Sequence, residues 1–104
     1  MIVRISKSPL MPEHILEKQF ENLTRRFKPA LIKQPGLVAA FWVKSPDGRR
    51  GSITIWESEE LMKAGGEAAS ATPLLPGQER RDLPGPGQEV QFLEVLEHHI
   101  SGGA

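Results

Sequence analysis

The sequence predicts an α+β fold in which four strands and two helices follow one another as strand, helix, strand, strand, helix, strand. Two observations lead to this prediction. Four stretches rich in apolar, β-branched and aromatic residues, each bounded by prolines, glycines or charged residues, are typical of strands. Two longer stretches between them carry helix signals: one spaces its apolar residues by three and four, and the other begins with a capping serine. This order is that of a ferredoxin-like βαββαβ fold, with a four-stranded antiparallel sheet.

Length and composition limit the function classes. With 104 residues the chain has room for one hydrophobic core, so we expect a single domain over residues 1–100 and a flexible tail at 101–104. Its 13 basic residues balance 13 acidic ones, so we expect neither a nucleic acid nor a membrane partner. The absence of cysteine excludes disulfides and thiolate sites. The first residues form a strand pattern rather than a signal segment, so the expected location is cytoplasmic.

The first strand is predicted over residues 2–6, and the first helix begins near Pro12. The apolar stripe of this helix is Leu16, Phe20, Leu23 and Phe27. Pro29 lacks an amide proton and its ring clashes with the preceding turn. We therefore expect the regular helix to end or kink near residues 26–28, with a further turn over 30–33.

A hairpin follows, with strands predicted at 37–44 and 51–57 around the turn Ser45-Pro46-Asp47-Gly48. Ser58 is the predicted N-cap of the second helix. Gly65 and Gly66 each cost about 1 kcal/mol relative to alanine inside a helix, so this helix is predicted to fray early. The prolines and glycines of residues 72–87 predict a long loop, which either covers a pocket, reaches onto the partner subunit as an arm, or is a surface connection. The last strand is predicted over residues 89–97.

Neither face of the predicted sheet is polar. One face collects Val3, Ile5, Leu37, Ala39, Phe41, Val43, Ile53, Ile55, Val90, Phe92 and Leu96. The other collects Ile2, Val38, Ala40, Trp42, Trp56, Leu93 and Val95, with Arg4, Ser6, Ser52 and Thr54 among them. Two helices can cover only one face, so we expect an uncovered apolar face that carries Trp42 or Trp56. A homodimer that packs these faces together is the simpler solution, and a loop folded back over the face is the alternative.

Two segments support a family resemblance. Gln34-Pro35-Gly36-Leu37 precedes the hairpin, and Thr54-Ile55-Trp56-Glu57-Ser58-Glu59-Glu60 leads into the second helix. This arrangement resembles the antibiotic-biosynthesis-monooxygenase-like group of the dimeric α+β barrel superfamily, over residues 1–97 as an order of elements. The resemblance implies a homodimer with a ligand cleft between sheet and helices. It also implies one of two activities, because the group includes cofactor-independent monooxygenases of polycyclic aromatics or quinols and haem-degrading enzymes.

The haem-degrading branch of this group does not match. Its pattern has an asparagine at the end of the first strand, a tryptophan in the second helix and a later histidine that binds iron. The corresponding positions here are Ser6, a residue near Gly65 and a residue near Leu75. We therefore do not expect haem degradation, and we expect no cofactor. The adjacent His98 and His99 point to opposite sides of a strand, so no metal site is expected either.

The expected function is that of a dimer that binds a small apolar or aromatic ligand. It is either a cofactor-independent monooxygenase of a small aromatic or quinol-like substrate, or a non-catalytic binding or accessory dimer with a degenerate pocket. The monooxygenase needs a dry cavity and a hydrogen-bond donor for the developing substrate anion. The resemblance places the pocket candidates at Ser6, Arg4, Trp42, Thr54 and Trp56. No catalytic residue follows from the sequence.

Overall fold

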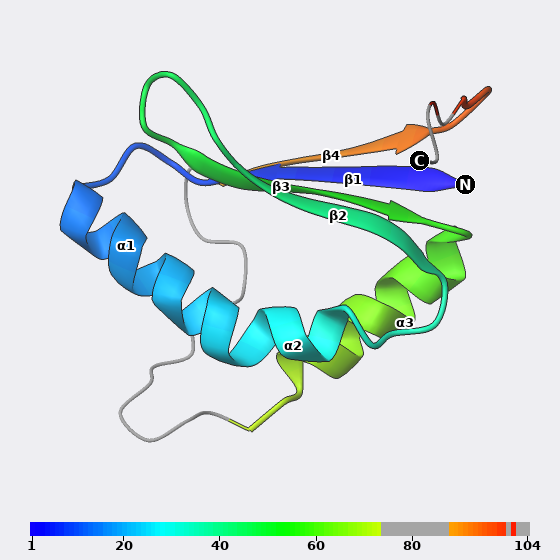
Figure 1. The fold of residues 1–104 in the computed structure, drawn as a ribbon, viewed down its shortest axis with the longest axis horizontal. Coiled ribbons are helices and arrows are strands. Elements are labelled where there is room, and N and C mark those ends of the chain that lie inside the picture. Colours follow the sequence, from blue (N-terminus) through cyan, green and yellow to red (C-terminus); the bar gives the residue numbers. More distant parts are fainter. Residues whose placement is uncertain (74–87, 100, 102–104) are drawn as a thin grey trace.

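The structure is a computed structural model that describes residues 1–73, 88–99 and 101. It has a four-stranded antiparallel sheet with all helical segments on one face, as Figure 1 shows, which confirms the predicted ferredoxin-like α+β fold. From residue 74 onward, the predicted loop at 72–87 lies outside the described residues. Within the described part of the chain, no helix has the length and apolar character needed to cross a membrane.

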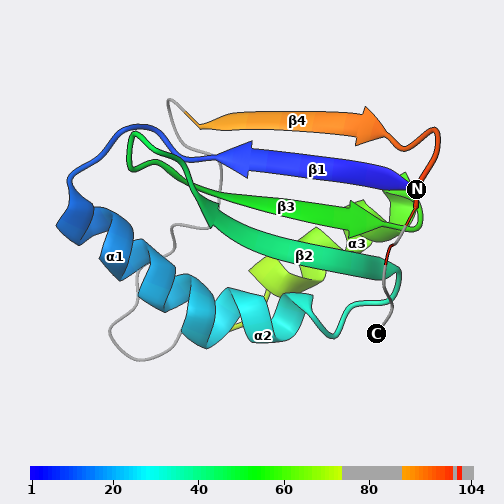
Figure 2. The same cartoon turned by 45° about the horizontal axis from the view of Figure 1, so that its top comes forward.

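The sheet consists of β1 (Ile2–Lys7), β2 (Leu37–Lys44), β3 (Arg50–Trp56) and β4 (Glu89–Glu94), in the order β2-β3-β1-β4 (Figure 2). All neighbouring strands run antiparallel. β-branched and aromatic residues fill the three strands β1 to β3, as the sequence predicts. The last strand ends at Glu94 rather than at residue 97.

The first helical segment runs from residue 13 to residue 31 with a change of winding in its middle. It consists of α1 (Glu13–Asn22), a π-helical turn η1 (Leu23–Phe27) and α2 (Lys28–Leu31). The Lys28 amide donates a hydrogen bond to the Leu23 carbonyl, one residue further back than in an α-helix. The regular helix therefore ends earlier than predicted, at Asn22. The wider turn lies directly before Pro29, where the ring and the missing amide disturb α-helical bonding.

Helix α3 (Glu59–Ser70) begins as predicted and ends later than predicted. The Ser58 hydroxyl accepts a hydrogen bond from the Leu61 amide and caps the helix. The predicted early fraying at Gly65 and Gly66 is wrong, because the helix continues to Ser70. Tertiary packing at Gly65 outweighs the unfavourable helix propensity of glycine.

The buried core lies between the sheet and the end of the helical layer formed by α2 and α3. It consists of Leu31, Trp56, Met62 and Ala69. Trp56 is 2% exposed, and a Cβ atom on Gly65 would come within 2.5 Å of its Cη2 atom. Glycine at position 65 therefore lets α3 approach the indole ring more closely than any other residue would.

Gly36 in the Gln-Pro-Gly-Leu segment has a similar role at the start of β2. Its φ of +84° lies in the left-handed region that glycine adopts readily. A Cβ atom at this position would lie 2.5 Å from Leu61 Cδ1 on α3. The Gly36 carbonyl also accepts a hydrogen bond from the Glu57 amide at 2.8 Å. This glycine therefore joins the turn before β2 to the start of α3.

The register corrects the predicted sheet faces. Phe92 lies opposite Arg4, and Leu93 lies opposite Val3, so the residues of the last strand belong to the faces opposite to those predicted. An irregularity between Leu37 and Ala39 also turns Leu37 toward the Trp56 side. Both tryptophans lie on the face that the helices cover, so the prediction that Trp42 or Trp56 is on the bare face is wrong.

The face without helices is nevertheless apolar. Its residues are Val3, Ile5, Ala39, Phe41, Val43, Ile53, Ile55 and Leu93. Phe41 is 53% exposed and Leu93 is 50% exposed. An apolar surface of this kind is uncommon on monomeric proteins. The bare apolar face therefore consists of a different set of residues from the predicted one.

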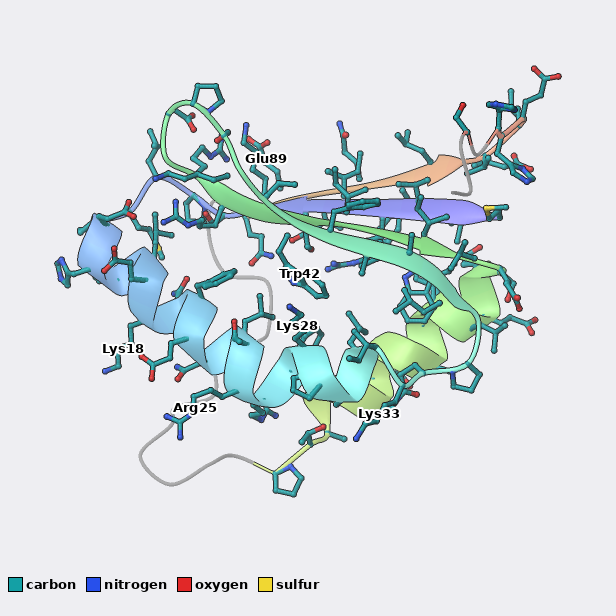
Figure 3. The ribbon with its side chains drawn as sticks, in the orientation of Figure 1. Lys18, Arg25, Lys28, Lys33, Trp42 and Glu89 are labelled. Atoms are coloured by element: carbon teal, nitrogen blue, oxygen red, sulfur yellow. The ribbon has the colours of Figure 1, made fainter. Side chains whose placement is uncertain are left out.

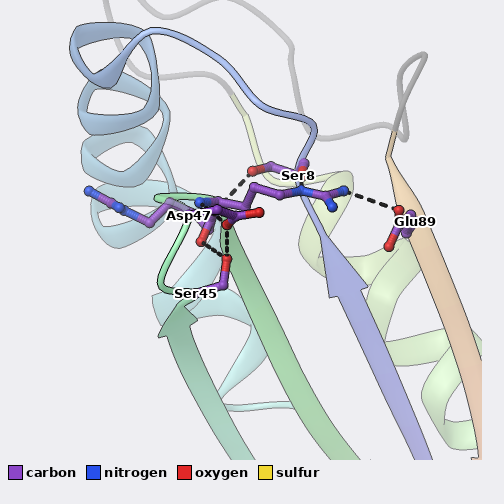
Figure 4. A network of polar contacts seen from close by, with 6 residues as sticks. Ser8, Ser45, Asp47 and Glu89 are labelled. Carbon is purple, nitrogen blue, oxygen red and sulfur yellow. Dashed lines mark hydrogen bonds and ion pairs between the residues drawn. The ribbon is translucent and has the colours of Figure 1, made fainter.

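Polar contacts join the hairpin turn to the other strands (Figure 4). Asp47 accepts hydrogen bonds from the Ser45 hydroxyl and from the Arg49 amide, and these bonds lower the pKa of its carboxyl group. Arg49 donates from Nε to the Ser8 carbonyl at 2.7 Å and lies 3.2 Å from the Glu89 carboxylate. The turn is therefore connected to the end of β1 and the start of β4.

The two adjacent glycines of α3 allow a matched stability test. Gly65→Ala places a methyl group against the buried Trp56 ring, so we expect the free energy of unfolding to fall by about 1–2 kcal/mol despite the better helix propensity. Gly66 has no heavy atom within 4 Å of its ideal Cβ position. Gly66→Ala should therefore raise the free energy of unfolding by about 0.5–1 kcal/mol. Urea denaturation measures both, and equal effects of the two variants would contradict the packing described.

Candidate functional site

A cavity of about 580 Å³ lies between the sheet and the helical layer. It is within the size range of small-molecule sites. Its floor is formed by side chains of the helix-covered face of the sheet, and its wall by α1, η1 and α3. The buried core around Trp56 closes one end of the helical layer, and the cavity occupies the remainder.

The floor of the cavity is the polar part of this sheet face. One row across the sheet reads Ala40, Thr54, Arg4 and Phe92, and the next reads Trp42, Ser52, Ser6 and Val90. Of these residues, Arg4, Ser6, Trp42, Ser52, Thr54 and Phe92 line the cavity. Gln88 donates a hydrogen bond to the Ser6 hydroxyl at 3.3 Å. These two rows therefore present hydroxyl groups and the Arg4 guanidinium between two aromatic rings.

The wall of the cavity combines apolar residues of the first helical segment with polar residues such as Gln19 and Glu67. It contains the whole predicted helix stripe, Leu16, Phe20, Leu23 and Phe27. Leu16 is buried, whereas Phe20 is 46% exposed. Phe20 thus faces open space, whereas Phe27 packs against the core around Trp56.

Two polar contacts hold the wall in place relative to the sheet and to α3. Glu13, at the start of α1, forms an ion pair of 2.6 Å with Arg50 of β3. Arg26 of η1 is 7% exposed, and its guanidinium donates hydrogen bonds to the Ser70 and Thr72 carbonyls at 2.8 and 3.0 Å. A cation is favourable there because carbonyl groups at a helix C-terminus carry partial negative charge. The cavity is therefore framed by charged contacts as well as by packing.

Trp42 stands between the sheet and the first helical segment, as Figure 3 shows. Lys28 of α2 approaches its ring, with Nζ 4.9 Å from the ring centroid. This cation–π contact restrains the indole at the edge of the cavity.

Arg4 is the charged residue at the centre of the floor. It is half-buried, and burial lowers the pKa of its guanidinium because the charged form loses hydration. An arginine nevertheless remains protonated at any physiological pH. The cavity therefore contains a permanent positive charge on its sheet side.

The structure brings four of the five candidate residues together. Arg4, Ser6, Trp42 and Thr54 all line the cavity. Trp56 does not, because its ring is enclosed by core residues, and its Nε1 atom has no hydrogen-bond partner in the described structure. Sequence reasoning missed Phe92 and Ser52 as lining residues. The alternation of β3 was the available signal for Ser52, since it shares a face with Thr54.

The cavity offers no histidine for haem iron among its described lining residues. The described side chains also contain no group of three histidine or carboxylate residues that could hold a metal ion. At the position near which the helical tryptophan of the haem-degrading pattern falls, Gly65 has no space for a side chain. The lining residues that the structure describes therefore do not fit a haem group held by an axial histidine.

Comparison with solved structures gives clear similarity of fold. A monooxygenase from the ActVA-Orf6 gene of Streptomyces coelicolor, in complex with nanaomycin D, matches with a TM-score of 0.64 and 20% identity, over 97% of this chain and 92% of that one. The haem degrader MhuD of Mycobacterium tuberculosis matches with a TM-score of 0.66 and 20% identity, over 95% and 99% of the two chains. SnoaB, a cofactor-independent oxygenase of Streptomyces nogalater, matches with a TM-score of 0.56 and 12% identity, over 93% and 94%.

No protein-family model matches the sequence, and no curated protein matches it. At these identities the structural matches show similarity of fold only, and one fold can host many functions. Structures of antibiotic-biosynthesis-monooxygenase-like proteins are thus the structural neighbours of this chain, and the resemblance predicted from its sequence is confirmed at the level of the fold.

Proposed function

We propose that this protein is a homodimer that binds a small aromatic or quinol-like molecule in the cavity and acts on it as a cofactor-independent monooxygenase. The observation that carries the proposal is the cavity of about 580 Å³, with the apolar stripe of the first helical segment in its wall and hydrogen-bond donors on its floor. Two of the structural neighbours are described as a monooxygenase and a cofactor-independent oxygenase. The pocket candidates are Arg4, Ser6, Trp42 and Thr54.

The proposed reaction needs only a few contributions from the protein. A quinol-like or anthrone-like substrate that loses a proton becomes an electron-rich anion that can reduce O₂ directly. In the overall reaction, one oxygen atom enters the substrate, and the other leaves as water with two hydrogens from the substrate. The hydroxyl and guanidinium donors on the floor can stabilise the anion, and the apolar stripe of the wall can shield the intermediate from water.

The homodimer part of the proposal rests on the bare face of the sheet. The helices cover only the Trp56 side, which leaves Phe41, Val43 and Leu93 each 42% exposed or more. Packing two such faces together would remove this apolar surface from water, at about 25 cal/mol per Å². A stable interface of this kind buries more than about 1,200 Å² in total.

A second function is favoured by one observation. Gly65 lies against Trp56 and leaves no space for an aromatic side chain in this part of α3. If the chemistry of the fold needs a ring there, this chain lacks it, and the protein is a non-catalytic binding dimer. The two functions share the cavity and differ in turnover.

Oxygen consumption separates them. We expect the protein to accelerate the oxidation of anthrone or of a naphthoquinol in the presence of EDTA, with one atom from ¹⁸O₂ incorporated into the product. Gly66→Leu fills the cavity, so kcat/KM should fall by at least tenfold. Ala68→Leu changes an exposed residue of the same helix that does not line the cavity, and its kcat/KM should match the wild type. Binding without any acceleration would favour the non-catalytic dimer.

Sedimentation velocity tests the dimer. The wild type should sediment as a dimer at micromolar concentration. Phe41→Glu places a charge on the bare face, where burial would cost several kcal/mol, so the dimer should dissociate at that concentration. Leu10→Glu adds the same charge at a residue that is 69% exposed outside the sheet, and it should leave the dimer intact. A monomeric wild type would show that the proposed assembly is wrong.

A further inference from the structure

We propose that the ligand of this cavity is an aromatic carboxylate whose carboxylate group pairs with the Arg4 guanidinium. The inference rests on the proposed function, that the cavity holds a small aromatic molecule, and adds the charge of that molecule.

The basic residues around the cavity differ in their partners. Among the described residues, four basic side chains line the cavity: Arg4, Arg26, Arg50 and Lys63. Arg26 donates to backbone carbonyls, and Arg50 and Lys63 form ion pairs with glutamates at 2.6 and 3.1 Å. Arg4 has no hydrogen bond or ion pair with any described residue. It is therefore the lining cation whose charge the described protein leaves unmatched.

The half-buried Arg4 guanidinium is energetically unfavourable without an anion. A guanidinium removed from water without an anion is costly, and buried charges in proteins are normally paired. Glu67 also lines the cavity, but it comes from α3 in the wall and forms no ion pair with Arg4. The arrangement is explained if a bound anion supplies the missing charge, since a charge-assisted hydrogen bond is among the stronger polar interactions.

The Arg4 guanidinium also indicates the type of anion. One unmatched guanidinium neutralises one negative charge, which suits a monovalent group better than a phosphate dianion. The planar fork of arginine matches the two oxygens of a carboxylate. Phe92 of β4 lies directly opposite Arg4, and Trp42 lies in the next row of the floor. An aromatic ring attached to the carboxylate would contact these side chains and the apolar stripe of the wall.

Three probes of one size test the inference: 2-naphthoate, its neutral isostere 2-naphthamide, and 2-naphthol. Isothermal titration at pH 7 should show naphthoate binding about ten- to a hundredfold more tightly than naphthamide, as expected for one charge-assisted contact. Arg4→Met should remove this preference and leave naphthamide affinity within about twofold. Arg4→Lys keeps the charge but loses the fork, and should retain part of the preference. Arg25→Met removes an exposed charge that does not line the cavity, and should retain all of it.

Other outcomes would overturn the inference in distinguishable ways. Equal affinity of the wild type for naphthoate and naphthamide would show that the cavity does not select an anion, while leaving it as a site for aromatic ligands. Tighter binding of naphthol than of naphthoate would assign the site to phenols instead of carboxylates. An equal loss in Arg25→Met and Arg4→Met would indicate general attraction by net charge. Binding of none of the three probes would remove the proposed ligand cavity as well.

Discussion

The contact between the Trp56 ring and Gly65 determines how the helical layer lies on the sheet. Because glycine has no side chain, α3 approaches the indole closely, and the core of Leu31, Met62 and Ala69 forms around it. Dense packing is confined to this end. Beyond it, the first helix faces the sheet across an open space, and that space is the candidate site. One close approach therefore makes the fold stable where it is filled and leaves it hollow where a ligand would bind.

Charged residues compensate for the packing that the cavity lacks. An amphipathic helix normally buries its apolar stripe against the core. Here that stripe lines the cavity, so the helix needs other attachments. The Glu13–Arg50 ion pair holds its start, and the Arg26 hydrogen bonds to carbonyls at the end of α3 hold its π-helical turn. These directional contacts keep a ligand-sized space open, because they fix the distance between elements without filling the volume between them.

Much of the fold could be predicted from the sequence because its signals are local. Apolar periodicity, the Ser45–Gly48 turn and the Ser58 cap each act within a few residues. Long-range features could not be predicted. The last strand follows a long connection, which does not fix register as a tight hairpin does, so the face predicted for Phe92 is wrong. Arg4, Ser6 and Thr54 could be proposed because the family resemblance implies a cleft between the sheet and the helices. Trp56 does not line the cavity because α3 packs on its ring at Gly65, and no local signal in the sequence predicts this contact.

The single-layered sheet has a consequence for how substitutions act. Even-numbered residues of β1, β3 and β4 point to the cavity side, and odd-numbered residues point to the bare face. The same holds for β2 after its irregularity between Leu37 and Ala39. Neighbours in sequence thus belong to two separate surfaces that share only backbone atoms. The parity of a strand position therefore tells toward which surface its side chain points, although the odd-numbered Val43 and Gly51 at the sheet's end also line the cavity. Selection can change the chemistry of one surface and the association of the other almost independently, within the same four strands.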